Sequence, residues 1–242
     1  MKRSAVILGC ILFSISACES SDQYVEQGRT YLRAGKFREA VQVLNQAVEA
    51  DADNVEAFNS RGVAYFELKD YGNASLDYDQ AIKLDPNFYR PYYNRGLLKV
   101  AKNDLAGALK DYSDAIRLAP DTSRRMASEI YLNRGQLFAA QDQIQPALND
   151  FTQAVTLDPK NALALYNRGN IRFQQKQLVG ATTDFQQSVQ ADPQFGKAFY
   201  GLGLAQLLQD ERESGCLSLK QAQKLGYTDA ANAVAEYCEG RK

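Results

Sequence analysis

Hydrophobic and polar positions recur along most of the chain with a fixed period. One pattern, a large apolar residue, two polar residues, a small residue and a branched apolar residue, occurs five times. The copies are LNQAVEADA from Leu44, YDQAIKLDP from Tyr78, YSDAIRLAP from Tyr112, FTQAVTLDP from Phe151 and FQQSVQADP from Phe185, at spacings of 34, 34, 39 and 34 residues. Self-similarity at a fixed period predicts a repeat architecture, in which each unit buries its apolar face against its neighbours.

A second motif precedes these copies at a constant distance and ends in glycine. It reads NSRG at Gly62, YNRG at Gly96, LNRG at Gly135 and YNRG at Gly169, with looser versions at Gly28 and Gly203. The period is therefore 34 residues, with five extra residues between the third and fourth units.

The two motifs together resemble the tetratricopeptide repeat (TPR) family, a solenoid of helix-turn-helix units, over residues 21 to about 229. The resemblance implies an all-α, right-handed superhelical fold of six repeats with a C-terminal capping helix. The expected repeats are 21–54, 55–88, 89–122, 128–161, 162–195 and 196–229, with an insertion at 123–127 and a cap and tail at 230–242. The insertion either lengthens a connecting loop or adds a turn to the next helix.

Small and large residues alternate at fixed places within the units, which predicts where the helices touch. Small residues at positions 8 and 20 of each unit let two helices approach closely, and large residues at position 24 fill the space between them. Proline at position 32 ends the second helix of four units. Lys99 and Arg172 stand at position 11, where the family places a large apolar residue, so packing is expected to be weaker there.

The end of the chain predicts one more helix and a covalent link. Ala230, Val234 and Tyr237 fall at helical spacing after a turn at 226–229, with Thr228 as the expected N-cap. Cys216 and Cys238 are equidistant from this turn, so an antiparallel hairpin brings them side by side. In an oxidising compartment they form a disulfide contributing roughly 3 kcal/mol; the alternative is two buried reduced thiols.

The first residues, MKRSAVILGCILFSISAC, have the features of an export signal. Lys2 and Arg3 precede an apolar stretch that is too short to span a bilayer, which argues against a transmembrane anchor. The sequence from Ile15 to Cys18 resembles the lipobox of bacterial lipoproteins, which implies a signal peptide at 1–17, a lipidated Cys18 and a tether at 18–20. An ordinary secretory signal remains the alternative. By the same resemblance, Glu19 favours the outer over the inner membrane.

Composition narrows the possible chemistry. The chain contains no histidine, which excludes a Ser-His-Asp triad, a histidine general base and any His-ligated metal site. A formal net charge of −1 argues against nucleic acid as a partner. No phosphate-binding loop, dinucleotide fingerprint or paired-carboxylate motif is present, so we expect neither a cofactor nor enzymatic activity.

The resemblance implies a binding surface on the first helix of each repeat, which lines a groove in TPR proteins. Asn94, Asn133 and Asn167 recur at position 6, and their amides carry both a donor and an acceptor for a peptide backbone. Local hydrogen bonding by these residues is the alternative. The expected partner groove consists of Arg90, Tyr93, Asn94, Asn133, Gln136, Tyr166, Asn167, Asn170, Lys197 and Tyr200.

These features together predict a non-catalytic scaffold anchored to the bacterial cell envelope. Its partner would be a segment of another envelope protein lying in the groove. The alternative, also drawn from known TPR lipoproteins, is a pilotin-like lipoprotein that assists secretin or pilus assembly. The sequence does not set the oligomeric state.

Overall fold

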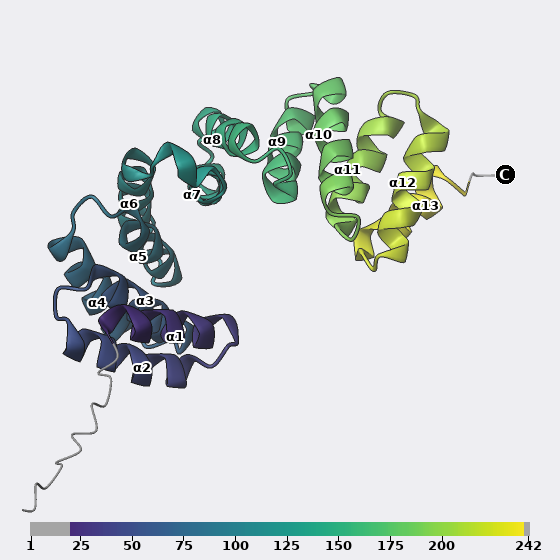
Figure 1. The fold of residues 1–242 in the computed structure, drawn as a ribbon. Helices are drawn as coiled ribbons and strands as arrows, with labels where there is room; N and C mark the ends of the chain where they lie inside the picture. The colour runs from purple at the N-terminus through teal and green to yellow at the C-terminus, as the bar shows by residue number, and fades with distance from the viewer. Residues whose placement is uncertain (1–19, 240–242) are drawn as a thin grey trace, which may run out of the picture. The chain divides into compact units, whose positions relative to one another are not determined.

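A computed structural model describes residues 20–239, and within that range the chain is helical with no strand. The prediction of an all-α fold is confirmed. Figure 1 shows the helices, which are α1 (Ser21–Arg33), α2 (Phe37–Ala50), α3 (Val55–Glu67), α4 (Tyr71–Leu84), α5 (Tyr89–Ala101), α6 (Leu105–Leu118), α7 (Arg124–Ala140), α8 (Ile144–Leu157), α9 (Ala162–Gln174), α10 (Leu178–Ala191), α11 (Gly196–Leu207), α12 (Arg212–Lys224) and α13 (Thr228–Tyr237).

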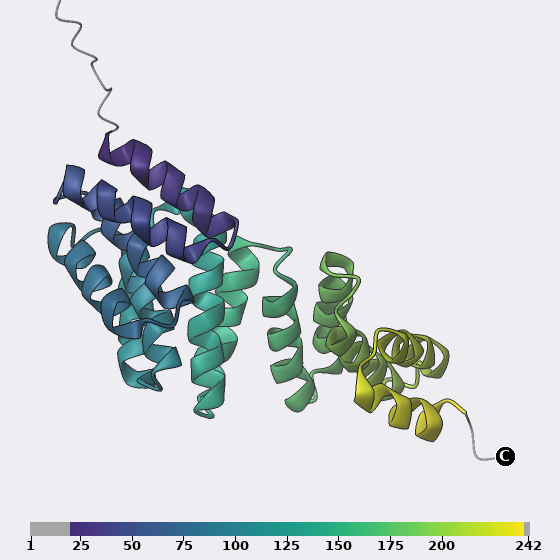
Figure 2. The same cartoon turned by 90° about the horizontal axis from the view of Figure 1, so that it is seen from below.

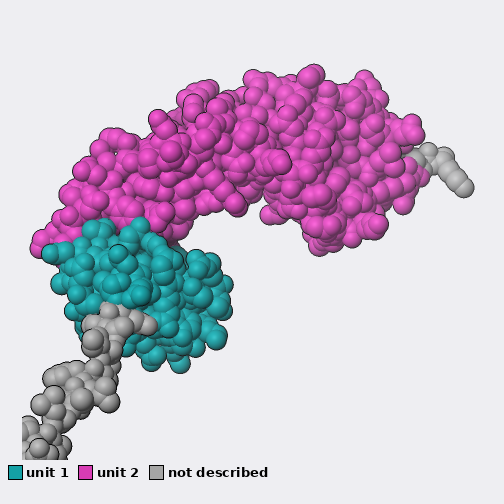
Figure 3. Space-filling model, in the orientation of Figure 1, with its two compact units in different colours: residues 1–77 teal, residues 78–242 magenta. Residues whose placement is uncertain are grey.

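The chain divides into two compact units, residues 1–77 and 78–242, and the division falls inside α4 (Figure 3). In the first unit α1 packs on α2, and α3 packs on both. In the second unit the antiparallel pairs are α5 with α6, α7 with α8, α9 with α10 and α11 with α12, and α13 packs on α12 (Figure 2). Each pair also contacts the next pair along the chain, which is the arrangement expected of stacked repeats.

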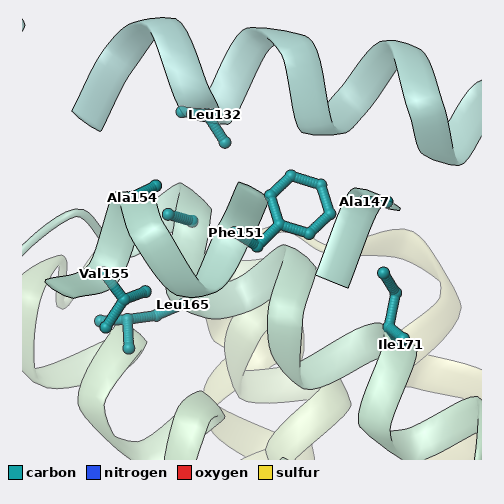
Figure 4. Close-up of a cluster of buried hydrophobic side chains, with 8 residues drawn as sticks. Leu132, Ala147, Phe151, Ala154, Val155, Leu165 and Ile171 are labelled. Atoms are coloured by element: carbon teal, nitrogen blue, oxygen red, sulfur yellow. The ribbon is translucent and has the colours of Figure 1, made fainter. Parts of the chain in front are cut away.

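A glycine on the first helix closely approaches a large side chain on the second in five helix pairs: Gly28 with Leu44, Gly96 with Tyr112, Gly135 with Phe151, Gly169 with Phe185 and Gly203 with Leu219. A β-carbon built on Gly135 would lie 2.8 Å from Phe151 Cε1, which leaves no room for a side chain. Phe151 is 1% exposed and packs with Leu132 and Leu165 between neighbouring helices (Figure 4). The predicted large residues at position 24 are all at most 1% exposed: Leu44, Tyr78, Tyr112, Phe151, Phe185 and Leu219.

The turn between the two helices of each repeat contains one residue in the left-handed conformation. Gly35 has φ of 69°, and the residues at the same place in the other repeats also have positive φ although they carry side chains. These residues are Lys69, Asn103, Asp142, Lys176 and Asp210. The prolines predicted to end helices lie just beyond the last residues of α4, α6, α8 and α10.

The structure decides how the insertion is accommodated and where the cap helix begins. A short 3₁₀ turn at Asp121–Ser123 leads directly into α7, which begins at Arg124, so the inserted residues lengthen the next helix. The cap helix is present, but its N-cap is Tyr227, and Thr228 is the first helical residue. The prediction for Thr228 was therefore wrong by one position, since helix ends are poorly fixed by side-chain type alone.

The predicted signal peptide, lipobox and Cys18 lie outside the described residues. Among residues 20–239, no helix combines the length and apolar character needed to cross a bilayer.

Candidate partner-binding groove

The first helices of the later repeats carry most of the predicted groove residues. Within the second unit α7 contacts α9, and α9 contacts α11. These helices contact one another because each repeat places its first helix against the first helix of the next. Side chains at positions 6, 9 and 13 therefore meet between neighbouring repeats.

Tyr93 and Asn133 are bonded to each other. The Asn133 Nδ2 donates to the Tyr93 hydroxyl over 3.0 Å, which links α5 to α7. Burial raises the pKa of Tyr93 to about 12, with a contribution from the charge of Glu129 and an opposing one from the Asn133 hydrogen bond. Two residues that were each expected to meet a partner thus form a link between repeats.

Gln136, Asn167 and Asn170 come together in a hollow of about 330 Å³ between α7, α8 and α9. Gln174 lines the same hollow, so four side-chain amides surround it, while Phe151 and Ile171 supply apolar contacts. We call this set the amide hollow. Asp142 is the only charged residue among those lining it, so the hollow suits an uncharged polar ligand.

The most informative atom in the amide hollow is Asn167 Nδ2. It is buried from solvent and has no hydrogen-bond partner among the described residues. Buried donors are almost always paired in folded proteins, because an unpaired one costs about 1–3 kcal/mol. Because this nitrogen has less than 1 Å² of accessible surface, a ligand carbonyl in the hollow would recover that free energy once the Asn167 side chain turned towards it.

The remaining predicted residues lie elsewhere. Arg90 stacks over the rings of Phe88 and Tyr89, at 5.8 and 5.9 Å, beside the inserted turn. Tyr166 packs on Phe195 at 4.9 Å between ring centroids, and Tyr200 packs on Tyr227 at 5.0 Å. Asn94 is half-buried on α5, and Lys197 is exposed on α11. The structure does not bring these residues into the amide hollow.

The arginine of the NRG motif has a structural role that was not predicted from the sequence. This arginine forms a two-pronged ion pair with an aspartate in the second helix of the same repeat. The pairs are Arg61–Asp77, Arg95–Asp111, Arg134–Asp150 and Arg168–Asp184, with N to O distances of 2.7–3.0 Å. The hydrogen bonds that these arginines donate to the carboxylates raise the pKa of Arg61, Arg95 and Arg134. The signal was available as Asp at position 23 wherever Arg stands at position 7.

Lys99 and Arg172 belong to the same set of ion pairs. Lys99 Nζ lies 2.8 Å from Asp111 Oδ2, and Arg172 NH1 lies 2.8 Å from Asp184 Oδ2. Both cations are half-buried against aspartates that are 1% exposed or less in their side chains. Their presence at position 11 therefore gives these aspartates a second cation.

The predicted cysteine pair is joined in the structure. Cys216 and Cys238 form a disulfide with a Cα to Cα distance of 5.5 Å, which ties α13 to α12. Among residues 20–239, no group of three or more Cys, Asp or Glu side chains is arranged to hold a metal ion.

Comparison with known families identifies the repeats over three stretches of the chain. Models described as tetratricopeptide repeat match residues 25–87 and 89–122, and a model described as TPR repeat matches residues 135–176. No curated protein sequence matches the chain.

Several solved structures share the fold. PilF of Pseudomonas aeruginosa aligns with a TM-score of 0.79 at 18% identity, covering 89% of this chain and 97% of PilF. PilW, described as a widely conserved type IV pilus biogenesis factor, gives 0.70 at 19% identity, with 89% and 98% covered. YrrB, described as a TPR protein with an unusual peptide-binding site, gives 0.64 at 21% identity, with 79% and 97% covered. At these identities the likeness shows the fold alone.

Proposed function

The chain belongs to the tetratricopeptide repeat family, and from that premise we propose that it is a non-catalytic scaffold that binds an extended segment of a partner protein in the amide hollow. The observation that carries the proposal is the buried, unpaired Nδ2 of Asn167. Amide side chains recognise the backbone of a peptide without regard to its sequence, because each offers a donor and an acceptor. With its side chain turned towards the hollow, Asn167 would donate to a partner carbonyl. Gln136, Asn170 and Gln174 would pair with neighbouring backbone groups.

We place the scaffold in the cell envelope, held by lipid on Cys18. The support is the lipobox-like sequence that ends the apolar N-terminal stretch. Several acyl chains anchor a protein stably, whereas one chain gives only reversible binding. Metabolic labelling with a palmitate analogue tests this assignment: the wild type takes up label, and Cys18→Ser does not. Equal labelling of both would contradict it. Our preference for the outer membrane rests on Glu19 alone.

The groove is tested by crosslinked affinity capture from native membranes with three forms of the full-length protein. These are the wild type, the double variant Asn167→Ala with Asn170→Ala, and the control Asn149→Ala, an exposed asparagine on α8 outside the hollow. All three should keep the helical circular dichroism signal. We expect a partner that is captured by the wild type and the control and lost by the double variant. Equal capture by all three would exclude the amide hollow as the binding surface.

A role in pilus assembly is the second candidate. Its support is the fold shared with PilF and with PilW, the latter described as a type IV pilus biogenesis factor. The discriminating measurement is deletion of the gene followed by electron microscopy of surface pili, with complementation by the wild type and by the double variant. Loss of pili that only the wild type restores would assign the hollow to this pathway. Normal piliation after deletion would exclude a role in pilus assembly and leave the general scaffold as the proposed function.

A further inference from the structure

A second, larger cavity lies at the C-terminal end of the second unit. Its volume is about 580 Å³, and α9, α11, the start of α12 and the end of α13 contribute to its walls. Figure 1 shows α11, α12 and α13 together at that end of the unit. We call it the terminal cavity; its lining residues are Phe173, Leu204, Leu207, Leu208, Asp210, Arg212 and Tyr237.

The walls of the terminal cavity are apolar and partly open to water. Leu208 is 61% exposed and Tyr237 is 43% exposed, whereas Phe173, Leu204 and Leu207 are half-buried. A ligand that covers exposed apolar area of this kind binds more favourably, because removing that area from water lowers the free energy. The cavity falls in the range of volumes typical of ligand pockets and differs from the amide hollow in having one charge of each sign at its edge.

The two charges, Asp210 and Arg212, define what else an occupant must offer. Neither makes an ion pair with any of residues 20–239. A peptide backbone presents an N–H donor for Asp210 and a carbonyl acceptor for Arg212 on either side of one side chain. An apolar cavity edged by this pair of charges therefore matches a peptide residue with a large apolar side chain.

Helix α9 connects the terminal cavity to the amide hollow. Asn170 and Gln174 line the amide hollow, while Phe173, adjacent to Gln174 in sequence, lines the terminal cavity. The two recesses thus lie on neighbouring sides of one helix, the first towards α7 and α8 and the second towards α11. A single extended segment that crosses α9 reaches both.

We propose that the terminal cavity binds one large apolar side chain, Leu, Ile, Met or Phe, of the same partner segment whose backbone lies in the amide hollow. The inference rests on the proposed function, because the continuity across α9 matters only if a peptide occupies the first recess. It defines the partner chemistry: an uncharged stretch that pairs through its backbone, joined to an apolar anchor. Amide pairing alone would not select among sequences, so the anchor supplies the specificity.

The disulfide fixes one wall of this cavity. Cys238 follows Tyr237 directly, and its bond to Cys216 holds the end of α13 against α12. Without that bond the last turn of a ten-residue helix would be free to fray. We expect reduction to weaken binding of the anchor and to leave the amide hollow intact.

The test begins with a random peptide library displayed on phage and selected on the full-length lipoprotein in detergent. Enriched peptides are synthesised, and each is measured by fluorescence anisotropy against the wild type, Leu208→Ser, Asn167→Ala and Leu217→Ser. Leu217 is a matched control: it is 66% exposed on α12 and does not line the terminal cavity. A companion peptide with its apolar anchor replaced by alanine completes a double-mutant cycle.

We expect enriched peptides to share one large apolar position, and replacement of that residue by alanine to weaken binding about tenfold. Leu208→Ser should weaken the parent peptide by a similar factor and the alanine peptide little, whereas Leu217→Ser should change neither. Asn167→Ala should weaken both peptides. Chemical reduction should act like Leu208→Ser.

Two results would separate this inference from the proposed function. If Asn167→Ala weakens binding but Leu208→Ser does not, the anchor cavity is wrong and the amide hollow stands. If Leu208→Ser weakens binding but Asn167→Ala does not, the amide hollow is wrong and the inference built on it falls as well. A library that yields no binder overturns both. A wild-type dimer in sedimentation that Leu208→Ser dissociates would assign the cavity to a second copy of the chain instead.

Discussion

Arg95 and Asp111 face each other across the two helices of one repeat, with Nε 2.9 Å from Oδ2 and NH2 2.8 Å from Oδ1. Asp111 is fully buried, and Lys99 approaches it from the same helix as Arg95. Arg95 also reaches Asp79 in the helix of the preceding repeat, at 2.6 Å. One arginine thus joins the second helices of two successive repeats, which couples neighbouring units by charge as well as by packing.

The equivalent pair in the fourth repeat gives the first prediction. Arg134→Ala leaves Asp150, which is 4% exposed, as an uncompensated buried carboxylate, and we expect a loss of about 3–5 kcal/mol of folding free energy. Replacing both partners by Arg134→Met and Asp150→Leu should cost less, because no buried charge is left. Urea unfolding followed by circular dichroism measures both variants.

Arg117→Ala is the control for that series. Its ion pair with Asp114 is largely exposed, at 65% and 28% of the side chains, so its removal should change stability by less than about 1 kcal/mol. An Arg134→Ala variant as stable as Arg117→Ala would show that the buried pairs contribute nothing to folding.

The second prediction concerns close helix packing. A β-carbon on Gly169 would lie 2.9 Å from Phe185 Cε1, and Phe185 is fully buried and cannot retreat. Gly169→Ala should therefore destabilise by about 1–3 kcal/mol, although alanine is the better helix former. Thermal melting by circular dichroism measures the change.

Gly72 on α4 provides the matched comparison. The nearest heavy atom to a β-carbon there is Asp70 Oδ1, at 3.8 Å. Gly72→Ala should therefore stabilise the protein by about 0.4–1 kcal/mol. If both alanine variants raised the melting temperature, helix propensity rather than packing would govern these positions.

The alternation of residue sizes made the core predictable from the sequence. Ala147 and Phe151 occupy places where sterics allow few alternatives, and each recurs in equivalent form every repeat. The bond between Tyr93 and Asn133 was not predictable, because the two residues are 40 positions apart and the insertion between them changes the register. The ion pair of Lys99 was not predictable either, because the sequence pattern marks this position as facing the core but does not reveal that the buried carboxylate of Asp111 lies beside it. The Asn167 amide was foreseen as a candidate, but only the structure reveals that its donor is unpaired.

The third prediction concerns the disulfide. Cys216→Ser with Cys238→Ser should lower stability by roughly 3 kcal/mol, because the bond closes a loop with a sequence separation of 22 residues in the unfolded chain. Adding a reductant should lower the melting temperature of the wild type and leave the double variant unchanged. A wild type that melts identically with and without reductant would contradict a structural role for the bond.

The fourth prediction concerns alkaline pH and Tyr93. Burial raises the pKa of Tyr93 from 10.0 to about 12, with Glu129 contributing and Asn133 opposing. The unfolded chain therefore loses the phenolic proton first, so this contribution to stability is complete below pH 10 and is lost as the pH rises through 12. At about pH 11 the loss amounts to roughly 1.4 kcal/mol.

The variant Tyr93→Phe has no phenolic proton to lose, so its stability lacks this pH dependence. It also loses the hydrogen bond to Asn133, worth about 1 kcal/mol. The wild type should thus be more stable at pH 8 and should lose its advantage near pH 11, as measured by urea unfolding across that range. Asn133→Ala removes the hydrogen bond but keeps the phenol, so its stability should fall with pH as the wild type's does. If the gap between the wild type and Tyr93→Phe stayed constant from pH 8 to pH 11, Tyr93 would not be the group that makes the fold alkali-sensitive.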